Sequence, residues 1–401
     1  VFVMVRRPAS STLAVTRLPS ATLFRSVAPA AAAAGSGLLI GLGIAAVVAI
    51  CNAMSSARLA ARYPQSGGTY VYGRERLGPF WGHTAGWSFI VGKTASCAAM
   101  ALTVGLYAWP AHAHAVAVGC VVALTALSYA GIQKSALLTK VIVAVVLAVL
   151  AMVVVVVLGF GDVDGSRLTV GRDVAAYGVL QAAGLLFFAF AGYARIATLG
   201  EEVRDPATTI PRATRISLGI ALAIYLLVAT AVLGELGSSE LAYADAPLAE
   251  AVRAAGFPAL APAVSVGAAV GALGALLALL LGVSRTMLAM ARDRHLPHAL
   301  AAVHPRRGIP HRAELTVGAV VAVATAVADI RSAIGFSSFG VLLYYAIANA
   351  SALTLGGRRL LPAIGLIGCL TLAFTLPLAS VLAGTAVVLI GMIAYAYGRN
   401  R

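Results

Sequence analysis

The sequence predicts an all-α protein that crosses a membrane many times, and its composition and hydropathy pattern carry that prediction. Of its 401 residues, 61% are hydrophobic and only 11% are charged, whereas roughly a quarter of the residues in a soluble domain are charged. The apolar residues form long blocks, such as Leu38 to Ala57 and Val141 to Phe160. Each block reaches the roughly 20 residues that a helix needs to cross about 30 Å of hydrocarbon.

These blocks predict about eleven transmembrane helices. In chain order we expect them at 37–58, 79–109, 112–132, 135–160, 174–200, 211–234, 257–292, 314–330, 332–355, 360–376 and 379–397. The last two come from one long run that carries no charge before Arg399. That run is long enough for two spans, and Pro377 marks the expected hinge between them.

The chain has a formal net charge of +15 and contains 29 Lys and Arg residues. The distribution of these residues between the two sides of the predicted membrane shows how the charge is arranged. With alternate loops assigned to opposite sides, 19 of these residues fall on one side and four on the other. The four are Arg167, Arg172, Arg253 and Arg331. This bias marks the richer side as cytoplasmic, so we expect a multi-pass protein of the plasma (inner) membrane with its C-terminus inside. No basic face, stacking-aromatic pattern or zinc-finger spacing indicates nucleic acid binding.

The N-terminal segment conflicts with this topology. The helix at 37–58 must run from outside to inside, which leaves four arginines on the outer side unless another span precedes it. These are Arg6, Arg7, Arg17 and Arg25. The uncharged stretches within 1–34 are too short for a span, and Ala30 to Ala34 is an alanine run. Three interpretations stay open: a first helix that is missing or scrambled, a divergent arm, or a segment that resembles a transit peptide.

Neither a cofactor, nor a metal, nor an enzymatic activity is indicated. The four cysteines lie inside apolar blocks without short metal-ligand spacing, so we expect small core residues. They are Cys51, Cys97, Cys120 and Cys369. All seven histidines fall in loops or at helix ends, and the chain contains no His-Glu-x-x-His, Gly-x-Ser-x-Gly or phosphate-binding Gly-Lys-Ser/Thr motif.

Several separated motifs resemble one known family. They are Ala60-Ala-Arg-Tyr-Pro-Gln-Ser-Gly-Gly-Thr-Tyr-Val-Tyr72, Gly78-Pro-Phe-Trp-Gly82, Phe187-Phe-Ala-Phe-Ala-Gly-Tyr193, Glu201-Glu-Val-Arg-Asp-Pro206, Ile210-Pro-Arg212, Ser284-Arg285 through Asp293 with Leu296-Pro297, and Leu343-Tyr-Tyr-Ala-Ile-Ala-Asn349. From about Pro29 to the C-terminus, their order and content closely resemble the amino acid permeases of the amino acid/polyamine/organocation (APC) superfamily.

The resemblance implies a LeuT-like fold. Two groups of five helices form an inverted repeat, and two accessory helices follow. We therefore expect an atypical segment at 1–34, a transport core at 35–355 and accessory C-terminal helices at 356–401. The implied function is secondary active transport of amino acids by alternating access. The alternatives are a non-transporting sensor or accessory subunit of the same fold, or a truncated inactive permease.

The resemblance also implies a substrate site where the sixth family helix is broken. Exposed amides and carbonyls at such a break bind the ends of an amino acid, and the matching residues here are Ala189, Phe190, Ala191 and Gly192. Phe188 matches an aromatic gate over the substrate. An ordinary small-residue helix contact and a plain core phenylalanine are the alternatives for the break and for Phe188.

Two cations are expected at membrane depth, where a charge costs at least about 2.5 kcal/mol. Lys93 lies 14 residues after Pro79, which places it near the middle of the bilayer. It can bind a substrate carboxylate, titrate, or serve as a fixed structural cation. Arg195 can form a gating salt bridge with Glu201 or Glu202, or it can extend to the interface.

Sequence differences from relatives reduce the number of possible coupling mechanisms. Val146 stands where some members carry a lysine in place of sodium, and Gly271 to Val283 lacks the hydroxyls of a sodium site. We therefore expect proton coupling or exchange. Ala194 replaces a Glu that relatives with cationic substrates carry, which favours neutral or acidic amino acids. The sequence does not indicate an oligomeric state.

Overall fold

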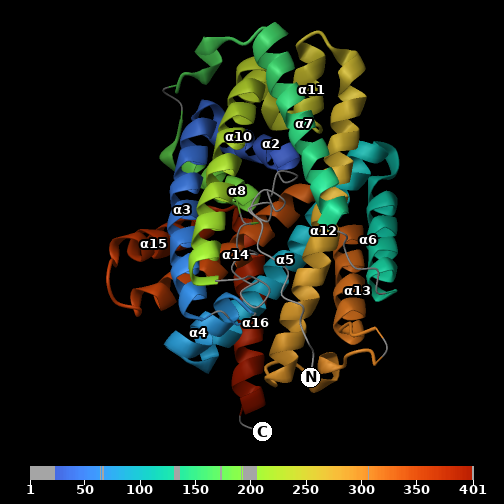
Figure 1. The fold of residues 1–401 in the computed structure, drawn as a ribbon. Helices are drawn as coiled ribbons and strands as arrows, with labels where there is room; N and C mark the ends of the chain where they lie inside the picture. Colours follow the sequence, from blue (N-terminus) through green and yellow to red (C-terminus); the bar gives the residue numbers. More distant parts are fainter. Residues whose placement is uncertain are drawn as a thin grey trace.

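The computed structural model describes residues 23–63, 65, 67–130, 136–171, 174–190, 192, 206–305 and 307–399, which form a bundle of helices (Figure 1). The helices are α2 (Leu23–Ala34), α3 (Leu38–Arg62), α4 (Thr69–Leu77), α5 (Pro79–Ala108), α6 (Ala113–Tyr129), α7 (Ala136–Phe160), α8 (Ala176–Phe190), α10 (Pro206–Tyr243), α11 (Pro247–Ala254), α12 (Ala261–Arg292), α13 (His311–Val327), α14 (Ile330–Leu353), α15 (Leu360–Thr375) and α16 (Leu378–Arg399).

Each of the eleven predicted helices has a counterpart in this bundle, which confirms the all-α membrane architecture. Eight helices of the described chain are long and apolar enough to cross a bilayer, and α8 and α15 are apolar but shorter. For α8, Ala176–Phe190, the pattern predicted a helix at 174–200; Gly192 has turn geometry, and residues 191 and 193–200 lie outside the described part of the chain.

The alanine run before residue 35 forms a helix that the sequence analysis did not expect. Alanine has the highest helix propensity, and its small side chain permits close packing against α8 and α10, both of which α2 contacts. At 12 residues, α2 is about 18 Å long. Arg25, assigned by charge counting to the outer surface, is 6% exposed, and its guanidinium carbon lies 5.0 Å from the centre of the Tyr107 ring.

The bundle has two ends, which we name by the short helices that they carry. The α4 end holds α4, the last turn of α12 and the C-terminal part of α16, whereas the α11 end holds α11 and the loop after α7 (Figure 1). At the centre, α5 and α14 are the most enclosed spans, with 72% and 83% of their apolar windows inside the protein. Only 22% of the corresponding windows of α6 and α16 are inside, so these two helices present their apolar surfaces to lipid.

Two glycines allow α5 and α14 to approach closely. A Cβ atom on Gly340 would lie 2.9 Å from the Cα atom of Gly92 and 2.9 Å from the carbonyl oxygen of Ser88. Small residues at such crossings let helix backbones pack directly in a membrane. One turn away, the hydroxyls of Ser96 and Ser337 are hydrogen-bonded at 2.5 Å. The crossing therefore forms a fixed central pair of helices, and Lys93 directly follows one of its glycines.

Candidate functional site

The first part of the candidate site is the end of α8. Phe188, Ala189 and Phe190 are at most 3% exposed, and Gly192 has turn geometry. The last turn of α8 therefore places main-chain carbonyls among buried side chains. The site residues Ala191, Arg195, Glu201 and Glu202 lie outside the described residues.

Two of the three phenylalanines at this end are held by tyrosines of other helices. The Phe190 ring packs edge-on against Tyr225 of α10 with ring centroids 5.0 Å apart, and Phe187 packs against Tyr345 of α14 at 5.8 Å. Such edge-to-face pairs stabilise a ring in one orientation. Phe188 makes no ring contact within the described part of the chain. Its orientation is therefore not fixed by an aromatic partner there.

Tyr225 also contacts the main chain at the end of α8. Its hydroxyl donates a hydrogen bond of 2.8 Å to the carbonyl oxygen of Ala189. Ala189 is the last residue but one of the helix. The tyrosine is completely buried. The end of α8 is thus joined to α10 through both a ring contact and a hydrogen bond.

The second part of the candidate site is Lys93 on α5. It lies near the middle of this 30-residue helix and is 6% exposed. The helix that packs against both parts is α14, which meets α5 at the Gly92–Gly340 crossing and meets α8 through Tyr345. The structure therefore connects Lys93 and the end of α8 through a common neighbouring helix.

A buried polar cluster lies farther along α14. The Asn349 side-chain amide donates to Asn52 Oδ1 of α3 at 2.6 Å, and the Cys369 thiol of α15 contacts the same oxygen at 3.3 Å. Amides in this position hold membrane helices together. Cys369 is therefore a small core residue that also takes part in a hydrogen bond. Within the described residues, no group of three or more His, Cys, Asp or Glu side chains could hold a metal ion.

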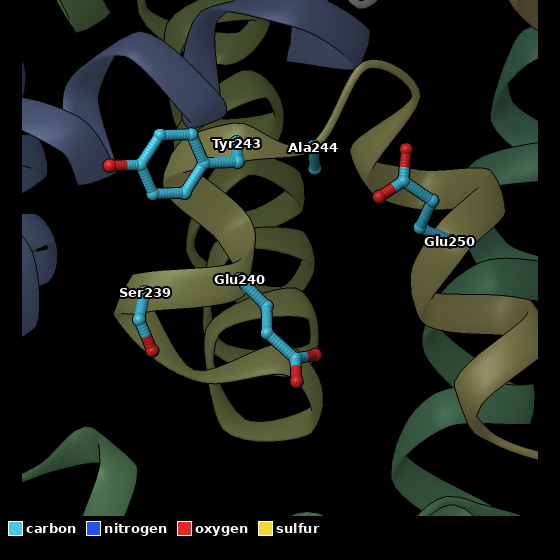
Figure 2. Close-up of a pocket in the computed structure, with 5 residues that line it drawn as sticks. All are labelled: Ser239, Glu240, Tyr243, Ala244 and Glu250. Carbon is cyan, nitrogen blue, oxygen red and sulfur yellow. The ribbon is translucent and has the colours of Figure 1, made fainter.

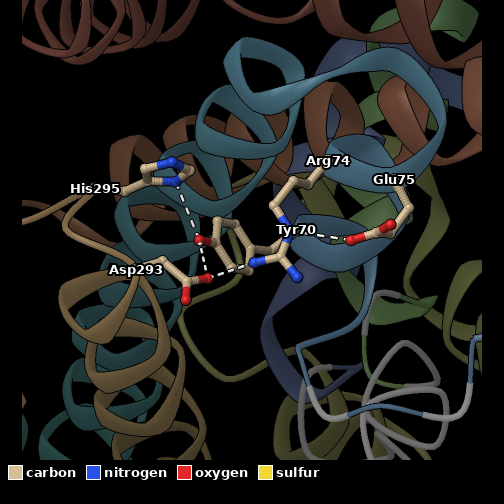
Figure 3. Close-up of polar contacts among 5 residues, drawn as sticks. All are labelled: Tyr70, Arg74, Glu75, Asp293 and His295. Carbon is tan, nitrogen blue, oxygen red and sulfur yellow. Dashed lines mark hydrogen bonds and ion pairs between the residues drawn. The ribbon is translucent and has the colours of Figure 1, made fainter. Parts of the chain in front are cut away.

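At the α4 end, a side-chain network joins α4 to the segment that follows α12 (Figure 3). Tyr70 donates to Asp293 at 2.6 Å, Arg74 Nη1 pairs with the same carboxylate oxygen at 2.5 Å, and the Tyr70 oxygen lies 3.0 Å from His295 Nδ1. Because an ionised carboxylate only accepts, the Tyr70 proton is directed to Asp293. Neutral His295 then carries its proton on Nδ1 and donates to Tyr70.

Burial and neighbouring charge determine the protonation of this network. Burial lowers the pKa of His295, and the Asp293 carboxylate opposes only part of that effect. Burial and the hydrogen bond to Asp293 raise the pKa of Tyr70 far above its usual range. The other rings around His295 are His83 and Tyr395, with centroids at 5.7 Å and 5.2 Å. Between α4 and the segment after α12, the network at neutral pH therefore contains one ion pair, Arg74–Asp293, and the neutral rings of Tyr70 and His295.

At the α11 end, arginines bind main-chain carbonyls. Arg167 donates to the carbonyls of Gly234 and Glu235, and Arg331 donates to the carbonyl of Ala242 at 2.8 Å. The first two carbonyls precede a kink in α10, where Gly237 has φ 72° and ψ 168°. A guanidinium at such a helix end satisfies freed carbonyls and complements the helix dipole.

An open pocket of 550 Å³ lies beside this kink and is shown in Figure 2. Its lining residues are Ser239, Glu240, Tyr243, Ala244 and Glu250. The two carboxylates come from the last turns of α10 and from α11. Glu250 Oε1 accepts from the Ala246 amide at 2.8 Å, so this carboxylate is already used to cap its own helix.

Sequence reasoning missed the tyrosines that position the end of α8. Tyr345 falls within the quoted stretch Leu343–Asn349, so the family resemblance offered a signal for it. Tyr225 lies inside an apolar block, and neither its spacing nor its neighbours distinguish it from a lipid-facing residue. Its importance follows only from a contact between two residues, Ala189 and Tyr225, that lie 36 positions apart in sequence.

Comparisons with known proteins agree with this architecture. The family model described as amino acid permease matches residues 8–397. An uncharacterized transporter of Mycobacterium tuberculosis is 70% identical over 384 residues, which cover 94% of this chain and 87% of that protein. The branched-chain amino acid permease BcaP of Bacillus subtilis is 24% identical over 408 residues, covering 91% and 86%. Human cationic amino acid transporter 4 is 28% identical over 356 residues, covering 82% and 56%.

These matches span most of the chain, and they accompany a bundle of membrane-crossing helices with quoted motifs in the family order. The family and the relatives are transporters, and none of the names reported above is that of an enzyme. The chain belongs to the amino acid permease family of the APC superfamily and is a multi-pass membrane transporter.

Proposed function

We propose that this protein is a secondary active transporter that moves amino acids across the plasma membrane by alternating access. The observation that carries the proposal is the end of α8 among buried residues, with Gly192 in a turn. A helix that stops inside a bundle presents carbonyls with partial negative charge, and the ammonium group of an amino acid is a suitable partner. The expected division into a core at 35–355 with an inverted repeat and accessory helices at 356–401 agrees with this role.

Orientation in the membrane follows from charge. Most of the described arginines in loops and near helix ends lie at the α4 end, including Arg62, Arg76 and Arg358, whereas the residues near the helix ends at the α11 end include Glu240 and Glu250. We propose that the α4 end is cytoplasmic, together with the C-terminus, because positively charged loops remain inside. The α11 end then faces the outside of the cell.

For the bound amino acid we propose two contacts. The ammonium group approaches the end of α8, and the carboxylate approaches Lys93, whose depth and burial suit a desolvated charge pair. Phe188, the one phenylalanine of the three without a ring partner in the described chain, is the proposed gate. A side chain that is not held by an aromatic pair can change rotamer at lower cost than Phe187 or Phe190.

Neutral or acidic amino acids are the proposed cargo. BcaP is named for branched-chain amino acids and the human relative for cationic ones. The names of the relatives therefore do not decide between neutral and cationic amino acids as the cargo. The buried ammonium of Lys93 repels a second cation in a medium of low dielectric constant. We propose proton coupling or exchange as the mode, since Val146, buried in α7, offers no charge at the position where relatives carry a lysine.

The test is uptake by the purified full-length chain in liposomes. Labelled L-leucine, L-glutamate and L-arginine are supplied with and without a pH gradient, and with and without the same amino acid inside. We expect uptake of leucine or glutamate that depends on the gradient or on internal amino acid. Absence of both dependences for all three compounds contradicts the proposed transport, and uptake of arginine alone contradicts the proposed cargo.

Substitution of Lys93 tests the proposed carboxylate contact. Loss of a buried charge-assisted hydrogen bond costs about 1.5–3 kcal/mol, so Lys93→Gln is expected to raise the apparent KM roughly 10-fold to 100-fold. Lys93→Arg keeps the positive charge and is expected to recover part of the affinity. The matched control is Lys140→Gln, at the lipid-exposed start of α7. Unchanged KM and pH dependence in both Lys93→Ala and Lys93→Gln removes Lys93 from the site.

A further inference from the structure

Five arginines from three segments of the chain lie at the α4 end of the bundle, next to α15. They are Arg58, Arg62, Arg76, Arg358 and Arg359. We infer that these arginines form a binding site for the phosphate headgroup of an anionic phospholipid, whose acyl chains lie along the apolar faces of α3 and α15. Lipid binding at this place is independent of the proposed transport of amino acids.

Hydrogen bonds to the main chain join α3 and α4 to the loop between α14 and α15. Arg58 of α3 donates to the carbonyls of Gly356 and Arg358, at 2.7 Å and 3.0 Å. Arg76 of α4 donates to the hydroxyl of Thr354 at 2.8 Å and also to its carbonyl. Carbonyl and hydroxyl groups carry no net charge, so these contacts bring the three segments together without neutralising either guanidinium.

The other three arginines, Arg62, Arg358 and Arg359, are exposed. Arg62 lies about one helical turn after Arg58, so both are on the same face of α3. Arg358 and Arg359 directly precede α15. Both ion pairs of the described chain involve Arg74, so none of the five arginines is paired with a carboxylate there.

The helices around this cluster contribute no acidic side chain. Glu75 is the first acidic residue of the sequence and Asp329 is the last, so α3, α14, α15 and α16 contain neither Asp nor Glu. Glu75 itself contacts Arg74 at 3.2 Å. Guanidinium groups bind phosphate oxygens through paired hydrogen bonds. A group of arginines without carboxylates therefore favours an anion, and phosphate is the anion that suits its donors.

Apolar side chains lead up to the arginines on both helices. On α3, Ile40 and Val47 are 45% and 52% exposed. Arg58 follows them by about five and about three helical turns, which places all three on one face of the helix. On α15, Leu360 and Ile367 are 71% and 66% exposed and lie about two turns apart. Each helix therefore presents apolar side chains to the hydrocarbon and arginines where the hydrocarbon ends.

The two apolar faces belong to neighbouring helices, because α3 and α15 lie side by side (Figure 1). A Cβ atom on Gly368 of α15 would lie 2.7 Å from Val48 Cγ2 of α3, so the helices are in direct contact. A phospholipid matches both parts of this surface, whereas a dissolved phosphate ion matches only the arginines. In the proposed orientation the site faces the inner leaflet, whose anionic lipids attract basic segments at the membrane surface.

The test is lipid binding by the purified full-length chain in detergent micelles, followed by native mass spectrometry as the mole fraction of lipid increases. The probes are phosphatidylglycerol, which has one negative charge, phosphatidylcholine, which has no net charge, and inorganic phosphate. We expect phosphatidylglycerol to bind at a lower mole fraction than phosphatidylcholine, and an equal concentration of inorganic phosphate not to displace it. Equal binding of the two lipids, or displacement by phosphate, overturns the inference.

A double variant tests the location of the site. Arg358→Gln with Arg359→Gln is expected to raise the apparent dissociation constant for phosphatidylglycerol about 10-fold to 30-fold, since each arginine near a charged lipid surface contributes about 1 kcal/mol. The matched control is Arg292→Gln with Arg294→Gln, because both residues are exposed at the end of α12. It removes the same charge and is expected to change the constant less than about twofold. An equal change in both double variants assigns the effect to net charge and overturns the inference.

Hydrogen exchange gives a second readout. Amides in peptides covering 354–362 are expected to exchange more slowly in the wild type when phosphatidylglycerol is added, and to show no such slowing in Arg358→Gln with Arg359→Gln. Without lipid, both double variants are expected to unfold at the wild-type temperature, because the four side chains are exposed. Unchanged exchange in the wild type with lipid bound overturns the inference. Neither readout needs transport, so a failure of the proposed function leaves both results decisive.

Discussion

The two ends of the bundle are held together by different kinds of contact. At the α4 end, Tyr70, Arg74, Asp293 and His295 contact one another through their side chains, and one of these groups, the imidazole of His295, has an ordinary pKa near neutral pH. At the α11 end, Arg167 and Arg331 donate to main-chain carbonyls instead. Main-chain carbonyls do not titrate and cannot be removed by substitution.

The difference indicates which change of conditions or of conformation alters the contacts at each end. Contacts of the α4 end change with proton concentration, since protonation of His295 alters the charges of the network. Contacts of the α11 end depend on the backbone path of α10, which turns at Gly237. A change of pH is therefore expected to act on the α4 end, and a change of backbone conformation on the α11 end.

The largest expected effect is at the α11 end, from Gly237→Ala. The dihedral angles φ 72° and ψ 168° lie in a region that residues with a Cβ atom occupy only at a cost of about 1–3 kcal/mol. The variant is expected to lower the thermal unfolding midpoint in detergent. The control is Gly43→Ala in α3, where a Cβ atom meets nothing within 4 Å. Equal midpoints for the two variants would show that the kink does not need glycine.

At the α4 end, Asp293→Asn tests the network. The substitution keeps the shape of the side chain and removes the charge that pairs with Arg74. Because these side chains are 29% and 39% exposed, solvent screens the pair and the expected loss is about 1 kcal/mol or less. Glu75→Gln is the control, since Glu75 contacts the same arginine at 3.2 Å from within α4 and is itself 42% exposed. If both variants lower the unfolding midpoint equally, the contact of Arg74 with Asp293, after α12, contributes no more stability than its contact with Glu75.

The smallest expected effect concerns pH and His295. Its pKa is lowered in the folded protein, so the unfolded chain, with a value of about 6.5, binds the proton more tightly. The stabilising contribution of neutral His295 is therefore present above pH 6.5 and is lost as the pH falls below that value. Between pH 7.5 and 5.5, His295→Gln is expected to lose less thermal stability than the wild type.

His298→Gln is the matched control for this comparison, because His298 lies on the same segment and contacts the Ala291 carbonyl instead of the network. It is expected to follow the wild-type pH profile. An identical profile for His295→Gln and His298→Gln would assign the pH response to other groups. It would also remove the proposed difference between the two ends of the bundle.

Much of the fold could be predicted from hydropathy, because blocks of apolar residues determine which segments enter the membrane. The same signal could not locate the turn at Gly192, because the preceding residues Phe190 and Ala191 are apolar and continue the block. Nor could it find α2. An alanine run is weakly hydrophobic, and its helix is stabilised by packing against α8 and α10, which no local pattern records.

For the candidate site, the depth of a residue in the membrane was easier to predict than the residues that it contacts. Counting residues from Pro79 predicted that Lys93 lies midway along its helix, and Lys93 is midway along α5. The side chains that surround the end of α8 come from α10 and α14, and the pairing of distant helices cannot be read from periodicity in one sequence. The role of Lys93 in substrate binding stays a prediction.

The amide cluster of Asn52, Asn349 and Cys369 has a consequence for the two C-terminal helices. A Cβ atom on Gly365 would lie 2.6 Å from Asn349 Oδ1, so the backbone of α15 itself covers the asparagine. Hydrocarbon cannot solvate an amide. Removal of α15 would expose the amides of Asn52 and Asn349, so this C-terminal helix separates the polar interior of the core from the lipid tails.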